Sequence, residues 1–250
     1  MAPIIRISVV LKSLFKGRIV DPFLDTAKFK KMSRALIIGA SGGIGGALVR
    51  VLQARGDNVI GLSRAHDGLD ITNHDSVAQV LDRISGVFDC IIVATGILAP
   101  PDGAPEKSLR AIDSAAMAHV MAVNAIGPAL VLAHLPRLLP RDRRAVVGVL
   151  TARVGSIGDN RLGGWYSYRA SKAAANQIVH TAAIEIARTH PQAVVAALHP
   201  GTVDTPFTTN HPRQKLSPHD AAQNLLNVMD GLGPDDTGAF FDWRGTRVIW

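Results

Sequence analysis

Five short apolar segments alternate along the chain with longer segments of helical periodicity, and this alternation restricts the fold more than any other feature. Each apolar segment is a continuous run, often β-branched, which is typical of strands buried on both faces. Repeated strand–helix–strand units predict a single doubly wound parallel α/β sheet with helices on both faces, because each crossover returns its helix to the sheet. The predicted strands are 35–39, 58–63, 89–95, 145–151 and 193–199.

The basic charge of the chain is concentrated near its N-terminus. The 250 residues carry a formal net charge of +7, and residues 1–31, with seven basic and two acidic side chains, supply +5 of it. The remainder shows no basic stripe with interleaved aromatic residues, so no nucleic-acid binding is expected. The apolar run ISVVL is too short to span a bilayer, so no membrane association is expected. We expect residues 1–33 to form a flexible extension, with a targeting peptide as the alternative, and residues 34–250 to form one domain.

The first predicted strand runs directly into the glycine-rich sequence GASGGIG. Gly39, Gly43 and Gly45 form the pattern G-x-x-x-G-x-G between a strand and an amphipathic helix. Glycines at these positions allow a tight turn and a close approach of the backbone to a diphosphate, whose charge faces the amides of the helix N-terminus. The pattern predicts a dinucleotide site, with a plain glycine-rich turn as the alternative.

The second predicted strand ends in Ser63 and Arg64. An NAD site usually has an acidic residue here that holds the ribose 2′-hydroxyl, whereas a hydroxyl and a guanidinium suit the 2′-phosphate of NADP. A solvated surface arginine is the alternative. We expect a preference for NADP(H), and NAD(H) stays open because Gly42, just before Gly43, is not a second basic residue.

Tyr168 and Lys172 lie four residues apart at the start of an alanine-rich helical segment, which puts them on one helix face. A free phenol has a pKa of about 10 and is a poor proton shuttle at neutral pH. A cation about 4 Å away, at an effective dielectric constant of about 20, is worth roughly 4 kcal/mol, or about three pKa units. The spacing predicts a tyrosine with a lowered pKa that acts as general acid for a carbonyl oxygen receiving hydride. A capping tyrosine beside a surface lysine is the alternative.

With these motifs the chain resembles the short-chain dehydrogenase/reductase family from about Ala35 to its C-terminus. The longer phrases VGSIGDNRLGGWYSYRASK and FFDWRG resemble the C-factor-like branch, which is related to the sniffer-type carbonyl reductases. The resemblance implies a Rossmann fold, with Tyr168 and Lys172 as catalytic residues. It also implies that Asp70, after a third strand, contacts adenine, and that Asn124 anchors a proton-relay water to the catalytic lysine. The implied cofactor-binding residues are Gly39, Ser41, Gly42, Gly43, Ile44, Gly45, Ser63, Arg64, Asp70, Ile71, Ala94, Thr95, Gly96, Tyr168, Lys172, Pro200, Gly201, Val203 and Thr205.

Two stretches depart from the family's pattern. Where the family usually has N-N-A-G, this chain has V-A-T-G at 93–96, so the asparagine side-chain bonds are absent. Where the family has a substrate-orienting serine three residues before a glycine, this chain has Ala152 before Gly155. We expect Thr151 to take over this role, with Ser156 as a second candidate and no replacement as a third. Losing one such donor costs roughly 10²–10³ in rate in comparable sites.

The leading interpretation is an NADP-dependent oxidoreductase that transfers hydride between the nicotinamide and a carbonyl or secondary alcohol substrate. The alternative from another class is an NAD(P)-binding signalling or regulatory protein with little turnover. No histidine or cysteine spacing indicates a metal site. The single cysteine, Cys90, excludes a disulfide framework and favours the cytoplasm. The resemblance implies a homodimer or homotetramer, and we expect a substrate lid around residues 203–217.

Overall fold

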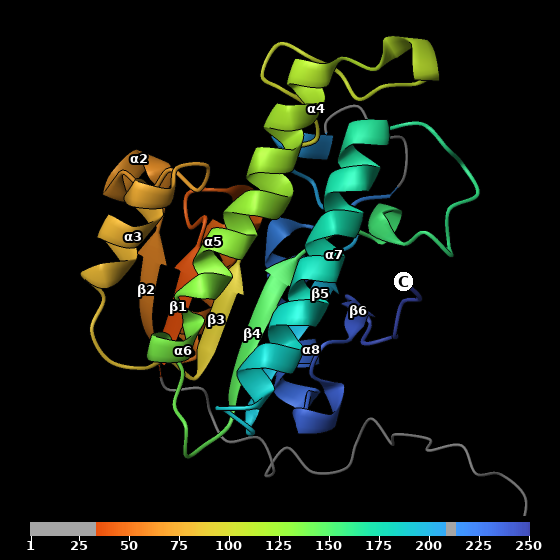
Figure 1. Cartoon of the computed structure of the whole chain (residues 1–250). Helices are drawn as coiled ribbons and strands as arrows, with labels where there is room; N and C mark the ends of the chain where they lie inside the picture. The colour runs from red at the N-terminus through yellow and green to blue at the C-terminus, as the bar shows by residue number, and fades with distance from the viewer. Residues whose placement is uncertain (1–33, 209–213) are drawn as a thin grey trace, which may run out of the picture. The chain divides into compact units, whose positions relative to one another are not determined.

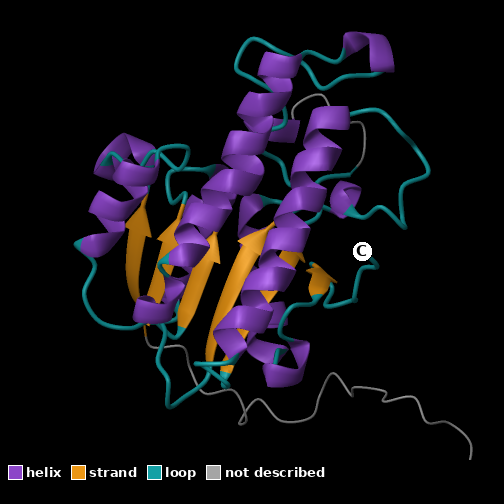
Figure 2. Cartoon of the chain, in the orientation of Figure 1, coloured by secondary structure: helices purple, strands orange, loops and turns teal. Residues whose placement is uncertain are grey.

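Six parallel strands form one sheet in the order β2-β1-β3-β4-β5-β6 (Figure 2). The computed structural model describes residues 34–208 and 214–250, so the expected extension 1–33 and the lid residues 209–213 lie outside the described residues. The strands are β1 (Arg34–Ile38), β2 (Asn58–Leu62), β3 (Cys90–Val93), β4 (Ala145–Leu150), β5 (Ala193–His199) and β6 (Phe240–Asp242).

Helices cover both faces of this sheet (Figure 1). The face toward the viewer carries α4, α5 and α7, and its core joins Val147 and Val195 of the strands to Val131 and Val179 of the helices. On the opposite face, α1 and α8 pack against the alternate strand residues. The helices are α1 (Gly43–Ala54), α2 (Arg64–Asp67), α3 (His74–Asp82), α4 (Ser114–Met121), α5 (Gly127–Ala133), α6 (Leu135–Leu138), α7 (Tyr166–Ala187) and α8 (Pro218–Gly231).

The strand order reverses at β1, because β2 is added on one side of it and β3 on the other. In open parallel sheets, ligands bind at the carboxyl ends of the strands beside such a switch point. The α/β fold class, with a doubly wound parallel sheet, is therefore confirmed. The glycine-rich sequence that follows β1 lies at this edge.

Two elements and one strand assignment differ from the expectations. Neither β6, which is only three residues long, nor α8 was predicted. Asp70 does not follow a third strand: it follows β2 and the short helix α2, whose N-cap Ser63 accepts a hydrogen bond from the His66 amide. The polar segment 64–68 forms this capped turn in place of a strand, so the implied position of Asp70 after a third strand is wrong.

The long apolar segment before β4 is interrupted by a π-helical turn at Ala122–Ile126, between α4 and α5. Pro128 has no amide hydrogen, so it cannot make the ordinary α-helical bond to the carbonyl of Asn124. The Gly127 amide instead donates to the carbonyl of Ala122, five residues earlier. The run 114–133 is also long and apolar enough to cross a membrane by composition alone, but Val120, Val131 and Leu132 are buried within the protein.

Candidate active site

The glycine-rich loop between β1 and α1 is too tightly packed to hold larger residues. Gly39 has a φ of +92°, and a Cβ on it would lie 3.0 Å from the Ala94 carbonyl oxygen. A Cβ on Gly45 would lie 2.1 Å from the Gly39 carbonyl oxygen. Helix α1 begins at Gly43 and no side chain caps its N-terminus, while Ser41 and Gly42 are exposed. The loop therefore presents backbone amides and a helix N-terminus to solvent, which suits a diphosphate.

The end of β2 combines a buried hydroxyl with an exposed guanidinium. Ser63 is buried and Arg64 is exposed. The Ser63 amide donates to Asp67 Oδ2 at 2.7 Å, and the Ser63 hydroxyl lies 3.4 Å from the same oxygen. The end of β2 therefore presents the Arg64 guanidinium to solvent, and Asp67 is an acidic neighbour that sequence reasoning missed.

Asp70 and Ile71 have different environments. The carboxylate of Asp70 accepts hydrogen bonds from the Thr72 hydroxyl and amide, and these bonds hold its pKa below the ordinary value. Ile71 is buried and packs under the helix junction, where a Cβ on Gly127 would lie 2.6 Å from Ile71 Cγ1. Asp70 therefore stays charged at neutral pH, and Ile71 supports the sheet edge.

Tyr168 and Lys172 lie on one face of the first turns of α7, and both are buried. The Lys172 Nζ donates to the Leu150 carbonyl at 3.1 Å and lies 5.9 Å from the centroid of the Tyr168 ring. The Tyr168 ring makes edge contacts with Trp165 and Phe207, at centroid distances of 6.1 Å and 5.7 Å. The helix thus fixes the phenol between two aromatic rings and the lysine against the end of β4.

Burial shifts the pKa of both groups in the direction of the neutral form. It raises the pKa of the Tyr168 phenol above its ordinary value and lowers the pKa of Lys172 to about 8. The expected lowering of the Tyr168 pKa is therefore wrong for the chain alone, because burial raises it, and the Lys172 ammonium donates to the Leu150 carbonyl. A lysine with a pKa of about 8 is still mostly cationic at pH 7.

Asn124 sits in the π-helical turn and is fully buried beside this pair. Its Oδ1 accepts from the Ile97 amide at 2.8 Å, and its Nδ2 donates to the Ile97 carbonyl at 2.8 Å and to the Ser171 hydroxyl at 3.0 Å. A Cβ on Gly96 would lie 3.2 Å from both Asn124 Oδ1 and Lys172 Nζ. Because Gly96 has no side chain, the loop after β3 can lie close to Asn124 in the π-helical turn and to Lys172 on α7.

The segment after β5 closes the site from the opposite side. Gly201 has a φ of +84°, and a Cβ there would lie 3.0 Å from the Trp243 ring. Val203 is buried and bridges to Leu216, which joins the two described parts of the expected lid. A Cβ on Gly43 would lie 2.6 Å from Thr205 Cγ2, so the residues after Pro200 reach the glycine-rich loop.

Comparison with known proteins identifies the family of the chain. The family model for short chain dehydrogenases matches residues 67–216. The chain is also 32% identical to 1-hydroxy-2-glutathionyl-2-methyl-3-butene dehydrogenase of Rhodococcus sp. over 236 residues, covering 88% of this chain and 100% of that protein. The chain belongs to the short-chain dehydrogenase family.

Other comparisons with this short-chain dehydrogenase agree with the family assignment. C-signal of Myxococcus xanthus is 40% identical over 145 residues, covering 57% of this chain and 84% of that protein. A Burkholderia multivorans structure with bound NADP superposes with a TM-score of 0.75 at 28% identity, covering 88% of this chain and all of that chain. The carbonyl reductase Sniffer of D. melanogaster, at 21% identity, has the same fold with a TM-score of 0.74, covering 88% of this chain and 100% of that chain.

Two positions in this short-chain dehydrogenase carry none of the family's usual polar side chains. Ala94 donates its amide to the Ile38 carbonyl at 2.8 Å, and the buried Thr95 hydroxyl has no partner among the described residues. At the serine position stands Ala152, which is followed by a short 3₁₀ turn. The backbone approach at β3 is retained, and the serine hydroxyl is missing.

Neither expected substitute for that serine presents a free hydroxyl to solvent. Thr151 Oγ1 is buried and has no hydrogen-bond partner within residues 34–208 and 214–250. Ser156 is only 1% exposed, and its hydroxyl accepts a hydrogen bond from the Asp159 amide. Ser156 therefore supports the local turn.

Glu106 is a site residue that sequence reasoning missed. Its carboxylate accepts from the hydroxyl and the amide of Ser167, and its carbonyl accepts from the Trp165 amide at 2.5 Å. Trp165, with a φ of 55°, has the one positive φ of a non-glycine residue in the described chain, and it follows left-handed Gly163 and Gly164. Glu106 thus fixes the strained turn that delivers Tyr168 into the site. Its loop position, far from Tyr168 in sequence, gave no signal.

Proposed function

We propose that the chain is an NADP(H)-dependent oxidoreductase that transfers hydride between the nicotinamide and a carbonyl or secondary alcohol substrate. The observation that supports this proposal most strongly is that Tyr168, Lys172 and Asn124 lie together at the carboxyl edge of the sheet, where the glycine-rich loop begins. The Rhodococcus relative is a dehydrogenase, which supports the same class of reaction for this chain. A phenol, a cation and a dinucleotide loop together suit carbonyl reduction.

The glycine-rich loop fits the cofactor, because its close packing against Ala94, Thr205 and its own turn leaves uncapped backbone amides at the N-terminus of α1 for an anionic group. The amides at Ser41 and Gly43 would hold the diphosphate, and Asp70 would hold the adenine end. Ser63 and Arg64 would hold a 2′-phosphate. The bound dinucleotide would supply or accept the hydride. The NADP bound to the Burkholderia protein supports this choice, and the same loop also suits NAD(H).

Tyr168 would donate its proton to the carbonyl oxygen during reduction and accept one during oxidation. The Lys172 cation, with its Nζ 5.9 Å from the centroid of the Tyr168 ring, would favour the phenolate electrostatically. Lys172 would thereby offset part of the effect of burial and would also bind the nicotinamide ribose. Asn124, whose carbonyl Pro128 leaves without its ordinary donor, would hold the water that returns a proton to Lys172.

A second function is favoured by one departure from the family's sequence pattern and by one similar protein. The family's serine is absent at Ala152, and the C-signal protein shares 40% identity over 145 residues. A protein that binds NADP(H) and signals its presence would need the glycine-rich loop but little turnover. Such a protein would bind the cofactor as tightly as a reductase and leave carbonyl substrates unchanged.

The assembly and location are further parts of this proposal. We expect a homodimer or homotetramer in the cytoplasm, formed through the outer faces of the α4–α5 segment and α7. Ile126 is 51% exposed and Ile184 is 52% exposed on these faces, which leaves apolar surface for a second copy. Exposed apolar side chains in such positions commonly mark subunit contacts.

The test is oxidation of NADPH and NADH against a panel of ketones, aldehydes and diketones. The chain's two tyrosines provide a matched pair of variants, because Tyr168→Phe removes the proposed acid and Tyr166→Phe removes the neighbouring phenol. Turnover lost only in Tyr168→Phe supports the oxidoreductase. Tight NADPH binding with no turnover above the Tyr168→Phe background supports the cofactor-sensing protein.

A further inference from the structure

Three polar residues form a row across the carboxyl ends of neighbouring strands. β4 and β5 pair with Leu150 opposite Leu198, and the Thr151 amide continues the ladder by donating to the Leu198 carbonyl at 2.8 Å. β5 and β6 pair with His199 opposite Asp242. Neighbouring strands lie about 4.8 Å apart, so Thr151, His199 and Asp242 are successive neighbours in this row.

Their side chains point to the α7 face of the sheet. Val149 and Ala197, two residues before Thr151 and His199, belong to the core shared with α7, whereas Leu150 and Leu198 belong to the opposite core. Side chains alternate between faces along a strand. Thr151 and His199 therefore share the face that carries Tyr168 and Lys172.

Thr151 and His199 each have a buried polar atom without a partner in the described part of the chain. These atoms are Thr151 Oγ1 and His199 Nδ1. A buried polar atom that is left unpaired destabilises the fold. A hydroxyl can donate to an imidazole nitrogen, so rotation of these neighbouring side chains would satisfy both atoms together.

The imidazole of His199 is neutral at physiological pH. Burial lowers the pKa of His199 to about 4, Asp242 acts to raise it, and Arg153 acts to lower it. Arg153 Nη1 lies 3.9 Å from Asp242 Oδ2, so the guanidinium partly cancels the effect of the Asp242 charge on the imidazole. A neutral imidazole carries one N–H, and a hydroxyl donating to Nδ1 places that hydrogen on Nε2.

We propose that His199 replaces the family's absent serine: its Nε2–H donates a hydrogen bond to the substrate oxygen, and the Thr151 hydroxyl holds the ring by donating to Nδ1. This role rests on the proposed oxidoreductase function. The imidazole moves no proton, because the proton that the substrate oxygen receives comes from Tyr168. The side chain of Ala152 has no hydrogen to donate, and Ser156 lies beyond the strand end, after the 3₁₀ turn, where its hydroxyl accepts the Asp159 amide hydrogen. His199 is therefore the donor proposed at this edge.

Substitutions at position 199 separate the two nitrogens of the ring. Glutamine can place an amide N–H near the Nε2 position, whereas asparagine reaches only the Nδ1 position. We expect His199→Ala and His199→Asn to lower kcat/KM by about 10²–10³, and His199→Gln to keep it within about tenfold of wild type. Ala152→Ser, which restores the family's donor, should recover at least about tenfold when added to His199→Ala. His180→Gln is the matched control, because that imidazole bonds the Gly238 carbonyl away from the strand ends.

The state of the ring can be measured without turnover. In ¹⁵N NMR of the cofactor-free wild type at neutral pH, we expect a neutral His199 with hydrogen on Nε2 and a hydrogen-bonded Nδ1. Thr151→Val, which keeps the shape and removes the hydroxyl, should shift the Nδ1 resonance toward that of a free acceptor. Hydrogen on Nδ1, or a cationic ring, overturns the proposal.

These measurements also separate this proposal from the function on which it rests. If wild type reduces a carbonyl, Tyr168→Phe does not, and His199→Ala keeps wild-type kcat/KM, the oxidoreductase stands and the role of His199 is overturned. If no carbonyl is reduced by wild type, by Tyr168→Phe or by Ala152→Ser, the oxidoreductase function fails and the catalytic role of His199 fails with it. Retained NADPH affinity and melting temperature in the His199 variants show that any loss of kcat/KM is not loss of fold.

Discussion

At the scale of single residues, the end of β2 carries the groups that we propose to set the preference for one nicotinamide cofactor. Asp67 Oδ2 already accepts the Ser63 amide hydrogen at 2.7 Å. A 2′-phosphate beside Ser63 would compete with this carboxylate for the same donors and would be repelled by its charge. Arg64, exposed at the same turn, provides the opposing attraction. Under the proposed function, selectivity for NADP(H) depends on the balance of Arg64 and Asp67.

We predict that Asp67→Asn raises the affinity for NADPH relative to NADH by about tenfold, because about 1.4 kcal/mol of repulsion is a modest estimate for one removed charge. Arg64→Ala should shift the ratio in the opposite direction. Fluorescence titration of both variants with NADPH and NADH measures this ratio directly. An Asp67→Asn ratio equal to or below that of wild type would show that the carboxylate does not oppose the 2′-phosphate.

At the scale of the element, the first turn of α7 is held by the carboxylate of Glu106. Burial raises the pKa of Glu106, but the hydrogen bonds from Ser167 and from the Glu106 backbone together lower it by more than burial raises it. The pKa of Glu106 therefore lies below its ordinary value. A group whose pKa is lowered on folding stabilises the fold above its unfolded pKa, and that stabilisation is lost as the pH falls through its folded pKa. The hold on α7 is therefore complete at neutral pH and fails in acid.

We predict that Glu106→Gln lowers the free energy of unfolding at pH 7, and that the difference from wild type shrinks as the pH falls below about 4.3, the ordinary pKa of glutamic acid. Denaturant unfolding at several pH values measures this difference. The same variant should lower kcat more than it raises KM, because Tyr168 lies one residue beyond the Ser167 contact. A difference in stability that does not change with pH would contradict the role of the Glu106 charge.

The π-helical turn is a second local device, and it depends on Pro128. We predict that Pro128→Ala lowers kcat without lowering the melting temperature, because the new amide can bond the Asn124 carbonyl and convert the turn to α-helix. Steady-state kinetics and thermal unfolding of this variant test the prediction, with Pro136→Ala, on α6, as the matched control. Wild-type kcat in Pro128→Ala would mean that the carbonyl of Asn124 takes no part in proton transfer.

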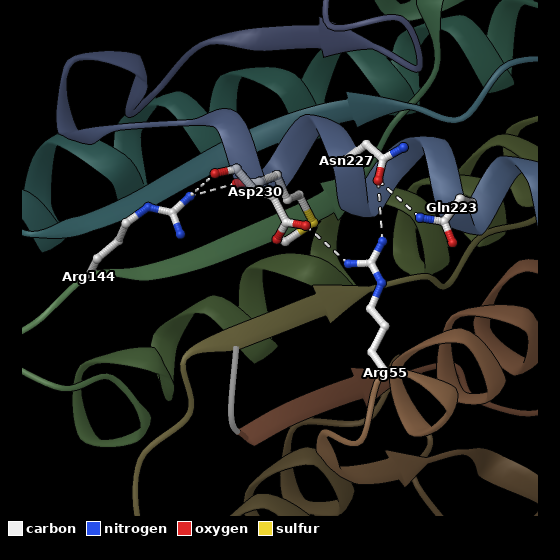
Figure 3. A network of polar contacts seen from close by, with 6 residues as sticks. Arg55, Arg144, Gln223, Asn227 and Asp230 are labelled. Carbon is white, nitrogen blue, oxygen red and sulfur yellow. Dashed lines mark hydrogen bonds and ion pairs between the residues drawn. The ribbon is translucent and has the colours of Figure 1, made fainter. Parts of the chain in front are cut away.

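At the scale of the whole molecule, the two edges of the sheet have separate roles. The carboxyl edge carries the site, and the amino edge carries the polar network drawn in Figure 3. Arg144 donates to the carbonyls of Met229, Asp230 and Leu232 at the end of α8. Arg55 joins the end of α1 to the Asp230 carboxylate at 3.0 Å. This network caps α8 and ties it to α1 and β4, far from the catalytic edge.

We predict that Arg144→Ala lowers the free energy of unfolding by about 1–3 kcal/mol, because partly buried carbonyls at a helix end lose a charged donor. Its kcat/KM should equal that of wild type, since the proposed catalytic groups lie at the other edge of the sheet. Chemical denaturation and steady-state kinetics test the two statements separately. A large loss of kcat/KM without loss of stability would contradict this separation.

The sequence allowed the parallel sheet and the main motifs to be predicted because each depends on local spacing. Continuous apolar runs mark the buried strands, and the Tyr168–Lys172 spacing is a property of one helix. β6 was not predicted because a three-residue strand has no period to detect. Glu106 and His199 were not assigned roles because their contacts depend on loop path and strand register, which join residues far apart in the chain.

The most direct test of the proposed oxidoreductase is a single-turnover experiment with NADPH deuterated at the transferring position. The panel of carbonyls is mixed with the preformed complex of wild type, Tyr166→Phe or Tyr168→Phe. We predict that deuterium appears on the former carbonyl carbon of a product with wild type and Tyr166→Phe, and that transfer is lost with Tyr168→Phe. Tightly bound NADPH that transfers no deuterium to any carbonyl, in wild type as in Tyr168→Phe, would contradict the proposed function.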